Sequence, residues 1–384
     1  MVALSETALP TTDRWDSELA GIALRFGAGR LGQLGAMVRE IGGSRALLVV
    51  DPGLREAGHI GQAERSLTEA GIEAVVFDGV VPNPNSAVVG AVAELARPHD
   101  VDFIVGMGGG SAMDCAKGAN FLLTNGGSME DYWGYDKASR PLLPSIGVPT
   151  TAGTGSDAQS YAVIARAGDG RKMACGAPGA AFRGVILDPS LLLSTPIETV
   201  AAAGIDAISH ALESHVSRTR TEASGRLSAE AWKLLDANFE ACFDPDADQT
   251  HCRGRMLIGA HLAGAAIEAS MLGAAHATAN PLTARHGVTH GDAVGLMLPS
   301  VIRHNGGSSE RLYLELWPEG YESLAERVET LRRLAGLPNR LREFEVPPSS
   351  LPQLAELATH EWTGRHNPRP LSERDFLKLY EAAY

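Results

Sequence analysis

Four short apolar runs alternate with helix-period segments in the first half of the chain, and this rhythm constrains the fold more than any other feature. The runs are RALLVV (45–50), EAVVF (73–77), VDFIVGMG (101–108) and LPSIGVPTT (143–151). Runs of this length and composition are typical of buried parallel strands. Between them, residues 29–41, 60–70 and 86–96 carry apolar residues at helical spacing. The alternation predicts an α/β domain built on a doubly wound sheet.

The second half of the chain has a different pattern, because β-branched runs nearly vanish after about residue 190. Ala/Leu/Glu-rich segments such as 199–217 and 222–241 follow, and 218–224 and 243–251 resemble loops between helices. A chain of 384 residues with 44% hydrophobic residues can bury two cores. We therefore expect an α/β domain over residues 1–193 and an all-helical domain over residues 194–384.

Charge and cysteine content exclude several classes of partner. The formal net charge of -13 disfavours nucleic acid, and no dense Lys/Arg cluster offsets it. No apolar run approaches the ~20 residues that a membrane span needs, and the N-terminus does not resemble an export signal. The four cysteines are far apart and form no CxxC pair, so neither a disulfide framework nor a thiolate metal site is expected. These features favour a cytoplasmic protein with no nucleic-acid or membrane partner.

A glycine-rich turn in IVGMGGGSAMDCAK (104–117) joins an expected strand to a helix that starts near Ser111. Backbone N–H groups at the start of such a helix can bind a pyrophosphate, and glycine permits its close approach. Ser111 occupies the third glycine position of the GxGxxG pattern, so the match is incomplete. A purely structural turn is the alternative, since glycine-rich corners are common in α/β folds.

Asp51 ends the expected strand 45–50 and is followed by Pro52. At the carboxyl edge of a sheet, its carboxylate could accept hydrogen bonds from an adenosine ribose 2′-OH and repel a 2′-phosphate, which favours NAD over NADP. A turn or helix N-cap aspartate is an equally good interpretation. The segment PTTAGTGSD (149–157) either lines a cofactor with its Thr hydroxyls or turns the chain.

Asp206 and His210 are four residues apart on a strongly helical segment, so both side chains project from one helical face. That arrangement can begin a metal site, although such pairs are frequent by chance.

The segment HATANPLTARHGVTH (276–290) adds His276, His286 and His290. Pro281 is expected to end the helix that carries the first of them, and spacing alone does not choose between the three histidines. One carboxylate with imidazoles suits Fe²⁺ or Zn²⁺ better than Mg²⁺ or Ca²⁺.

Taken together, the ordered motifs resemble the iron-containing (group III) metal-dependent alcohol dehydrogenase family almost from end to end. The resemblance implies a Rossmann-like dinucleotide-binding domain followed by an all-α metal-binding domain of the dehydroquinate synthase-like type. The motifs that carry it are FDGVVPNP (77–84), GGGSAMDCAK (108–117), PTTAGTGSD (149–157), AAAGIDAISHALES (201–214), the 276–290 segment, LPSVIRHN (298–305) and NPRPLSERDFLKLY (367–380).

The resemblance also implies site residues. The metal, Fe²⁺ or alternatively Zn²⁺, would be held by Asp206, His210, His276 and His290, and Tyr161 would face the substrate. The implied cofactor is NAD rather than NADP. Its implied binding residues are Asp51, Gly108, Gly109, Gly110, Ser111, Asp114, Thr150, Thr151, Thr154 and Lys172.

One position departs from the family pattern. Members usually carry a histidine four residues after the first histidine of the 276–290 segment, and here that residue is Asn280. Asparagine forms hydrogen bonds but does not relay protons near neutral pH. His286 could supply the missing imidazole as a second catalytic residue, or it could simply shape the pocket.

The implied activity is reversible hydride transfer between nicotinamide and a small primary alcohol or aldehyde. Arg285, Arg365 and His366 could instead select an aldehyde that bears a carboxylate, phosphate or phosphonate, unless they are solvated surface groups. Remote alternatives are a dehydroquinate synthase-like lyase and a non-catalytic binding protein. A homodimer or higher homo-oligomer is a family-level expectation.

Overall fold

The computed structural model describes residues 14–384, which form two compact units. The first, the α/β unit, comprises residues up to Thr151 together with Ser156–Thr195. The second, the helical unit, comprises Pro196–Tyr384 together with the short segment Ala152–Gly155. That segment belongs to the helical unit because its backbone lies against a helix there: a Cβ added to Gly155 would lie 2.6 Å from Gly264 Cα.

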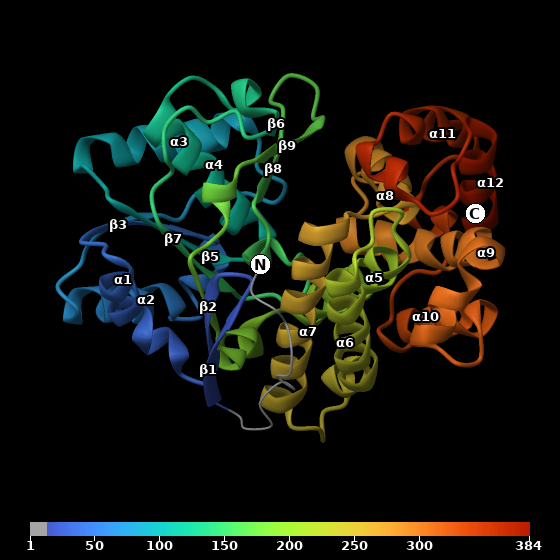
Figure 1. Cartoon of the computed structure of the whole chain (residues 1–384), viewed down its shortest axis with the longest axis horizontal. Helices are drawn as coiled ribbons and strands as arrows, with labels where there is room; N and C mark the ends of the chain where they lie inside the picture. Colours follow the sequence, from blue (N-terminus) through green and yellow to red (C-terminus); the bar gives the residue numbers. More distant parts are fainter. Residues whose placement is uncertain (1–13) are drawn as a thin grey trace. The chain divides into compact units, whose positions relative to one another are not determined.

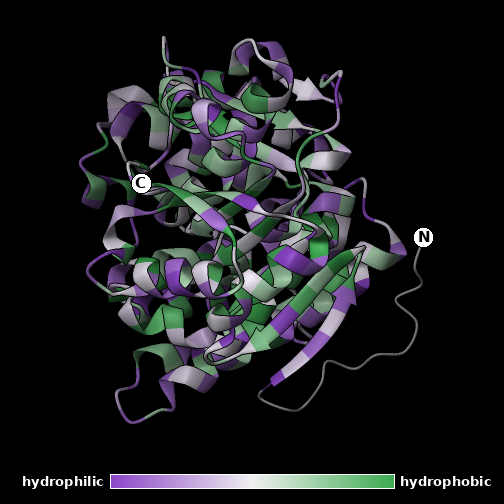
Figure 2. Cartoon of the chain, turned by 90° about the vertical axis from the view of Figure 1, so that its left-hand side faces the viewer, coloured by the Kyte–Doolittle hydropathy of each residue, from purple (hydrophilic) through white to green (hydrophobic). Residues whose placement is uncertain are grey.

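The α/β unit is built on a seven-stranded sheet with the order β1-β2-β10-β7-β5-β3-β4. Only β1 and β2 pair antiparallel, and all other neighbours are parallel. The strands are β1 (Arg14–Leu19), β2 (Ile22–Gly27), β3 (Arg45–Val50), β4 (Glu73–Phe77), β5 (Phe103–Gly108), β7 (Ser145–Pro149) and β10 (Gly184–Leu187). The four predicted strands are confirmed as β3, β4, β5 and β7. The edge strand β1 is largely hydrophilic (Figure 2), so it lacks the apolar signal of a buried strand.

Helices cover both faces of this sheet (Figure 1). Helices α1 (Leu34–Ile41) and α2 (His59–Glu69) lie on one face, and α3 (Ser86–Ala96) and α4 (Gly110–Asn125) lie on the other. A small second sheet has the order β6-β9-β8 and packs into the same core as α3 and α4. Its strands are β6 (Gly134–Tyr135), β8 (Tyr161–Ala165) and β9 (Lys172–Gly176). The doubly wound architecture expected from the sequence is therefore confirmed.

In the helical unit, every regular element between residues 196 and 384 is a helix, as the sequence pattern predicts. The α-helices are α5 (Ile197–Val216), α6 (Glu222–Phe239), α7 (Gln249–Ser270), α8 (Ala274–His286), α9 (His290–Leu316), α10 (Tyr321–Leu334), α11 (Leu351–Thr359) and α12 (Glu373–Ala383). Helix α5 packs against α6, α7 and α9. Among residues 14–384 no single helix is long and apolar enough to cross a membrane, and α7 and α8 meet that test only as a pair bent by 105°.

The expectation that Pro281 ends a helix is wrong, because Pro281 lies inside α8. A proline at this position removes one intrahelical hydrogen bond and disturbs the preceding turn. The surrounding packing compensates: Pro281 is buried, and the Tyr380 hydroxyl donates to the Thr278 carbonyl in that turn at 2.7 Å. The helix ends instead at His286, where Gly287 adopts a left-handed conformation.

Candidate active site

Helix α5 supplies the first half of the candidate metal centre. Asp206 and His210 lie one turn apart on its buried face and are only 3% and 4% exposed. His210 Nε2 lies 3.4 Å from Asp206 Oδ1. The two side chains predicted to share a helical face therefore do so inside the helical unit, where an unpaired carboxylate would be costly.

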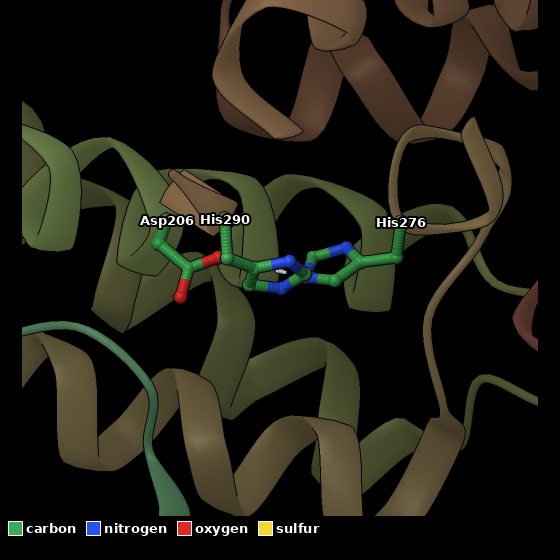
Figure 3. A group of neighbouring side chains, drawn as sticks. All are labelled: Asp206, His276 and His290. Atoms are coloured by element: carbon green, nitrogen blue, oxygen red, sulfur yellow. Dashed lines mark ion pairs between the residues drawn. The ribbon is translucent and has the colours of Figure 1, made fainter. Parts of the chain in front are cut away.

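The second half comes from α8 and α9. His276 lies in the first turn of α8, and His290 is the first residue of α9. The ligand atoms of Asp206, His276 and His290 lie within 4.8 Å of one another, and Figure 3 shows the Asp206 carboxylate and the His276 ring approaching from opposite sides. The His210 ring stacks on His276 with 4.9 Å between ring centroids. All four predicted ligands are thus neighbours, with His210 outside the tightest group.

The charges in this cluster are strongly coupled. Burial by itself would raise the pKa of Asp206, but His210, His276 and His290 hold it well below its usual range. Burial by itself would lower the pKa of His276, but the Asp206 carboxylate, whose Oδ1 lies 3.5 Å from Nε2, and the hydrogen bond to Glu213 raise it to about 9. The carboxylates around His276 therefore favour a positive charge at this point.

Sequence reasoning missed Glu213, although it lies in the same α5 motif as Asp206 and His210. Glu213 is 3% exposed, and its Oε2 accepts a hydrogen bond from His276 Nδ1 at 2.5 Å. A carboxylate that binds Nδ1–H fixes the ring orientation and directs the Nε2 lone pair toward a cation. The detectable signal was a glutamate three residues after His210, on the same face of a buried helix.

The cluster fits a divalent cation. Asp206 Oδ1 and His276 Nε2 are buried, and within residues 14–384 neither atom has a hydrogen-bond partner. Buried polar atoms normally have partners, so two unpartnered donor atoms that converge on one point fit a bound cation. Imidazole nitrogens with one carboxylate oxygen are the donors that Fe²⁺ and Zn²⁺ accept.

The candidate nucleotide site lies in the α/β unit, where the strand order reverses. The chain runs from β3 outward to β4 and then returns to the other side of β3 to form β5. In open parallel sheets, ligands bind at the carboxyl ends of the strands on either side of such a switch point. Asp51 follows β3 and Gly108 ends β5, so the two predicted cofactor features meet at this point.

Asp51 and the glycine turn are in direct contact. Asp51 Oδ2 accepts a hydrogen bond from the Gly109 N–H at 2.6 Å, and Asp51 caps no helix with its side chain. Burial raises the pKa of Asp51, and the bond from Gly109 opposes that rise. Gly108 has φ +147°, and a Cβ there would overlap the Asp51 carboxylate. Helix α4 begins at Gly110, so its N-terminus opens directly from this turn.

The other predicted cofactor residues are distributed around this turn or away from it. Ser111 Oγ accepts from the Asn83 N–H at 3.2 Å. Thr150 is buried, and its N–H donates to the Gly108 carbonyl at 2.9 Å; Thr151 adjoins it in the same unit. Thr154 belongs instead to the helical unit.

Asp114 lies one turn into α4 and forms a buried polar network. Its carboxylate accepts from Ser156 Oγ at 2.6 Å and from the Val163 N–H at 3.2 Å. Burial raises the pKa of Asp114, while Lys117 and, more weakly, Lys172 act to lower it. Asp114 and Lys172 thus belong to one cluster of charged groups at the first turns of α4.

Comparison with known proteins identifies the family of the chain. Residues 23–189 match the iron-containing alcohol dehydrogenase family, and residues 200–384 match its C-terminal domain family. The chain is 31% identical over 377 residues to a 1,3-propanediol dehydrogenase of Citrobacter freundii, which spans 94% of this chain and 96% of that protein. The chain belongs to the iron-containing alcohol dehydrogenase family. It is therefore an oxidoreductase that acts on alcohol donors.

Solved structures of family members have the same fold. An alcohol dehydrogenase from Oenococcus oeni superposes with a TM-score of 0.91 at 28% identity and covers 94% of this chain and 98% of its own. A sulfoacetaldehyde reductase from Bifidobacterium kashiwanohense, in complex with NAD+, superposes with a TM-score of 0.86 at 26% identity and covers 96% and 98%. These relatives are all dehydrogenases or reductases, so they favour neither a lyase nor a non-catalytic binding protein.

Two predicted residues of this alcohol dehydrogenase lie on α8. Asn280 is one turn beyond His276, and its Nδ2 donates to Glu361 Oε2 at 2.8 Å. His286 is the last residue of the helix and is half-buried. Ideal helix geometry places it about 15 Å along the axis from His276 and roughly 80° around it. Asn280 therefore shares the face of His276, whereas His286 does not.

The predicted substrate residues lie in both units. Tyr161 begins β8 in the α/β unit, and its ring lies 5.3 Å from that of Tyr135. Arg285 and Arg365 are exposed, as expected of solvated surface charges. His366 is half-buried, and its Nδ1 lies 3.2 Å from the Thr219 hydroxyl.

Proposed function

We propose that this alcohol dehydrogenase catalyses reversible, metal-dependent hydride transfer between NAD and a small primary alcohol or aldehyde. The observation that carries the proposal is that Asp206, His276 and His290 converge in the helical unit. Glu213 accepts a hydrogen bond from Nδ1 of His276, on the side of the ring away from this point. A structural role alone would not require two orphaned ligand atoms at that point.

In this proposal Asp206, His210, His276 and His290 hold the metal, with Fe²⁺ the first choice and Zn²⁺ the second. When bound, the metal acts as a Lewis acid that stabilises negative charge on the substrate oxygen. Glu213 keeps the His276 Nδ1 proton in place, so that Nε2 is the atom that must lose its proton when a cation binds.

We propose NAD as the hydride carrier, bound at the switch point of the α/β unit. The N–H groups at the start of α4 would face the pyrophosphate. Asp51 uses one oxygen to hold the Gly109 N–H, and a carboxylate retains further acceptor capacity for a ribose hydroxyl. The sulfoacetaldehyde reductase relative was solved with NAD+, which supports this choice.

We propose Asn280, rather than His286, as the group that orients the substrate hydroxyl. Glu361 holds the Asn280 side chain through Nδ2, which fixes the amide plane, and its Oδ1 can accept a hydrogen bond from an alcohol. A His286→Phe variant should therefore keep the rate of the parent within about twofold and the same pH profile, since an aromatic ring preserves packing. A changed pH profile for NADH oxidation would assign the proton relay to His286.

The proposal is tested by measuring metal content together with NADH oxidation against a panel of aldehydes. Removal of the metal with a chelator should abolish turnover, and addition of Fe²⁺ or Zn²⁺ should restore it. A His276→Ala variant should lose bound metal and at least ~10³-fold in turnover, because the metal supplies several kcal/mol of charge stabilisation. Retained activity with stoichiometric metal in this variant would contradict the ligand assignment.

An anionic aldehyde is a second candidate substrate, supported by the sulfoacetaldehyde reductase relative. The panel should therefore contain neutral and anionic aldehydes of equal length. Arg285→Ala and Arg365→Ala variants test the two exposed guanidinium groups: an anionic substrate bound by either should lose about tenfold in kcat/KM when that group is removed.

We also propose a cytoplasmic location and a homo-oligomeric state. The four cysteines are free and buried, which suits a reducing compartment. Light scattering of the purified chain measures the oligomeric state directly.

A further inference from the structure

The N-terminus of α8, the helix that carries His276, is not capped by its own sequence. Its N-cap residue is Gly273, which has no side chain to accept a hydrogen bond from the first turn. The first N–H groups of a helix need acceptors from elsewhere, and buried ones need them most. Distant side chains supply them here: Asn367 Oδ1 accepts from the Ala274 N–H at 3.2 Å, and Glu213 Oε1 accepts from the Ala275 N–H at 2.7 Å.

Asn367 is itself held by a second asparagine. Asn305 Nδ2 donates to Asn367 Oδ1 at 3.0 Å, and Asn367 Nδ2 donates to Asn305 Oδ1 at 2.8 Å. Asn367 Nδ2 also donates to the Arg369 carbonyl at 2.7 Å. Both asparagines are 1% exposed. This reciprocal pair fixes the amide plane of Asn367 with its oxygen toward α8, and each buried amide gains partners that it would otherwise lack.

Gly273 leaves room for both acceptors. A Cβ at this position would lie 2.8 Å from Glu213 Oε1 and 3.0 Å from Asn367 Oδ1. Its φ of -147° lies outside the left-handed region, and the glycine leaves the space that the two acceptors occupy. The first turn of α8 thus donates hydrogen bonds to Asn367 and Glu213, and Glu213 also accepts a hydrogen bond from His276 Nδ1.

We infer that Asn305 and Asn367 are positioning residues for the metal centre, because together with Glu213 they fix the first turn of α8 and hence the direction of His276. The inference rests on the metal site of the proposed function. It gives a role to the asparagines in two motifs, LPSVIRHN and NPRPLSERDFLKLY, whose function the ligand set does not explain.

The first experiment is Asn367→Ala in the full chain. We expect about a tenfold weaker affinity for Fe²⁺ or Zn²⁺ in competition with a chelator, since groups that orient a ligand typically contribute 10- to 100-fold. Amide hydrogen exchange in the first turn of α8 should rise, and kcat should fall while the KM for NADH, whose proposed site lies in the other unit, stays unchanged.

The matched control is Asn85→Ala. Asn85 Oδ1 caps α3 of the α/β unit by accepting from the Ala87 and Val88 N–H groups at 3.1 and 3.2 Å. Its loss should lower the melting temperature without changing metal affinity. Asn367→Asp keeps an acceptor for Ala274 but loses the two bonds that Nδ2 donates to Asn305 and Arg369, so it should not restore the parent affinity.

Gly273→Ala tests the same geometry without deleting a polar group, and it also serves if Asn367→Ala fails to fold. Its methyl group should displace the two acceptors and weaken metal affinity about tenfold. The inference would be overturned if Gly273→Ala kept the metal affinity of the parent. It would also be overturned if Asn367→Ala lost melting temperature, as the Asn85 control does, but kept the parent metal affinity. The amide pair would then be a purely structural cap. A parent chain that binds neither metal would instead overturn the proposed metal centre and this inference with it.

Discussion

The two units provide their candidate sites in different ways. The α/β unit presents backbone N–H groups from a glycine turn, and its main side-chain contribution is the Asp51 carboxylate that holds Gly109. The helical unit presents side chains from α5, α8 and α9. The first site therefore depends on the path of the chain, and the second depends on the identity and orientation of individual side chains.

This difference follows from the ligands that each site suits. A pyrophosphate is large and diffuse, so it is bound by several N–H groups that must approach closely, which excludes side chains at the turn. A divalent cation is compact and needs lone pairs at about 2 Å, which imidazoles and carboxylates provide. Added bulk should damage the first site, and lost orientation should damage the second.

The largest effect is expected from Gly108→Ala, which places a methyl group against the Asp51 carboxylate at a backbone φ of +147°. Strain of this kind costs ~1–3 kcal/mol, so NADH affinity should fall by up to about 100-fold while metal content stays that of the parent. Isothermal titration with NADH measures this.

Gly90→Ala in α3 is the control, because a Cβ there meets open space, and it should leave NADH affinity unchanged. Parent-like NADH binding in Gly108→Ala would show that the nucleotide does not use this turn.

The opposite pattern is expected from Glu213→Gln. The neutral amide no longer favours the Nδ1–H form of His276, so metal affinity should fall about 10- to 100-fold with NADH affinity unchanged. Glu222→Gln, an exposed carboxylate of α6 paired with Arg226 at 2.5 Å, is the control. Unchanged metal affinity in the Glu213 variant, measured by chelator competition, would remove Glu213 from the centre.

Protonation should affect the stability of the helical unit through His215, a buried imidazole of α5 outside the metal cluster. Its Nδ1 lies 2.8 Å from Ser228 Oγ, and its Nε2 lies 3.4 Å from Glu315, which also pairs with Arg220. Burial, aided by Arg220 and opposed by Glu315, lowers the pKa of His215 to about 4.

Because the unfolded chain takes up this proton near pH 6.5 and the folded chain only near pH 4, stability should fall as the pH drops through that window, by on the order of 3 kcal/mol. Denaturant unfolding of the parent and of His215→Gln at each pH isolates this contribution. Equal slopes of unfolding free energy against pH in both proteins would disprove it.

A smaller effect is expected from Asp51→Asn. Loss of the charge should weaken NADH binding about tenfold and raise the relative use of NADPH, since a charged hydrogen bond contributes ~1.5–3 kcal/mol and the repulsion of a 2′-phosphate disappears. The ratio of kcat/KM for the two cofactors measures the change.

Asp78→Asn, which also follows a strand of the sheet but pairs with Arg55, should leave the ratio unchanged. A ratio in Asp51→Asn equal to that of the parent would place the ribose elsewhere.

Local pattern was sufficient for much of the fold. The strands β3, β4, β5 and β7 follow from short apolar runs, and the helical half follows from composition. The edge strand β1 is polar and β10 has only four residues, so neither was recognised as a strand. The prediction that Pro281 ends a helix was wrong because packing around α8, including the hydrogen bond from the Tyr380 hydroxyl to the Thr278 carbonyl, outweighs the local preference of proline.

The site was accessible to the sequence only in part. Spacing on α5 paired Asp206 with His210, and family resemblance selected His276 and His290 over His286. Glu213, Asn305 and Asn367 were not assigned, because their roles arise from hydrogen bonds to groups 62 or more residues away in sequence.

The sequence by itself determined the two-part architecture and the kinds of ligand available, because helix and strand periods and residue chemistry are local properties. Only the tertiary structure decided that Asp51 meets the Gly108–Gly109 turn at a switch of strand order, and that a helix without its own cap is seated between Glu213 and Asn367. Both depend on long-range packing, which brings distant backbone and side-chain groups to within hydrogen-bonding distance.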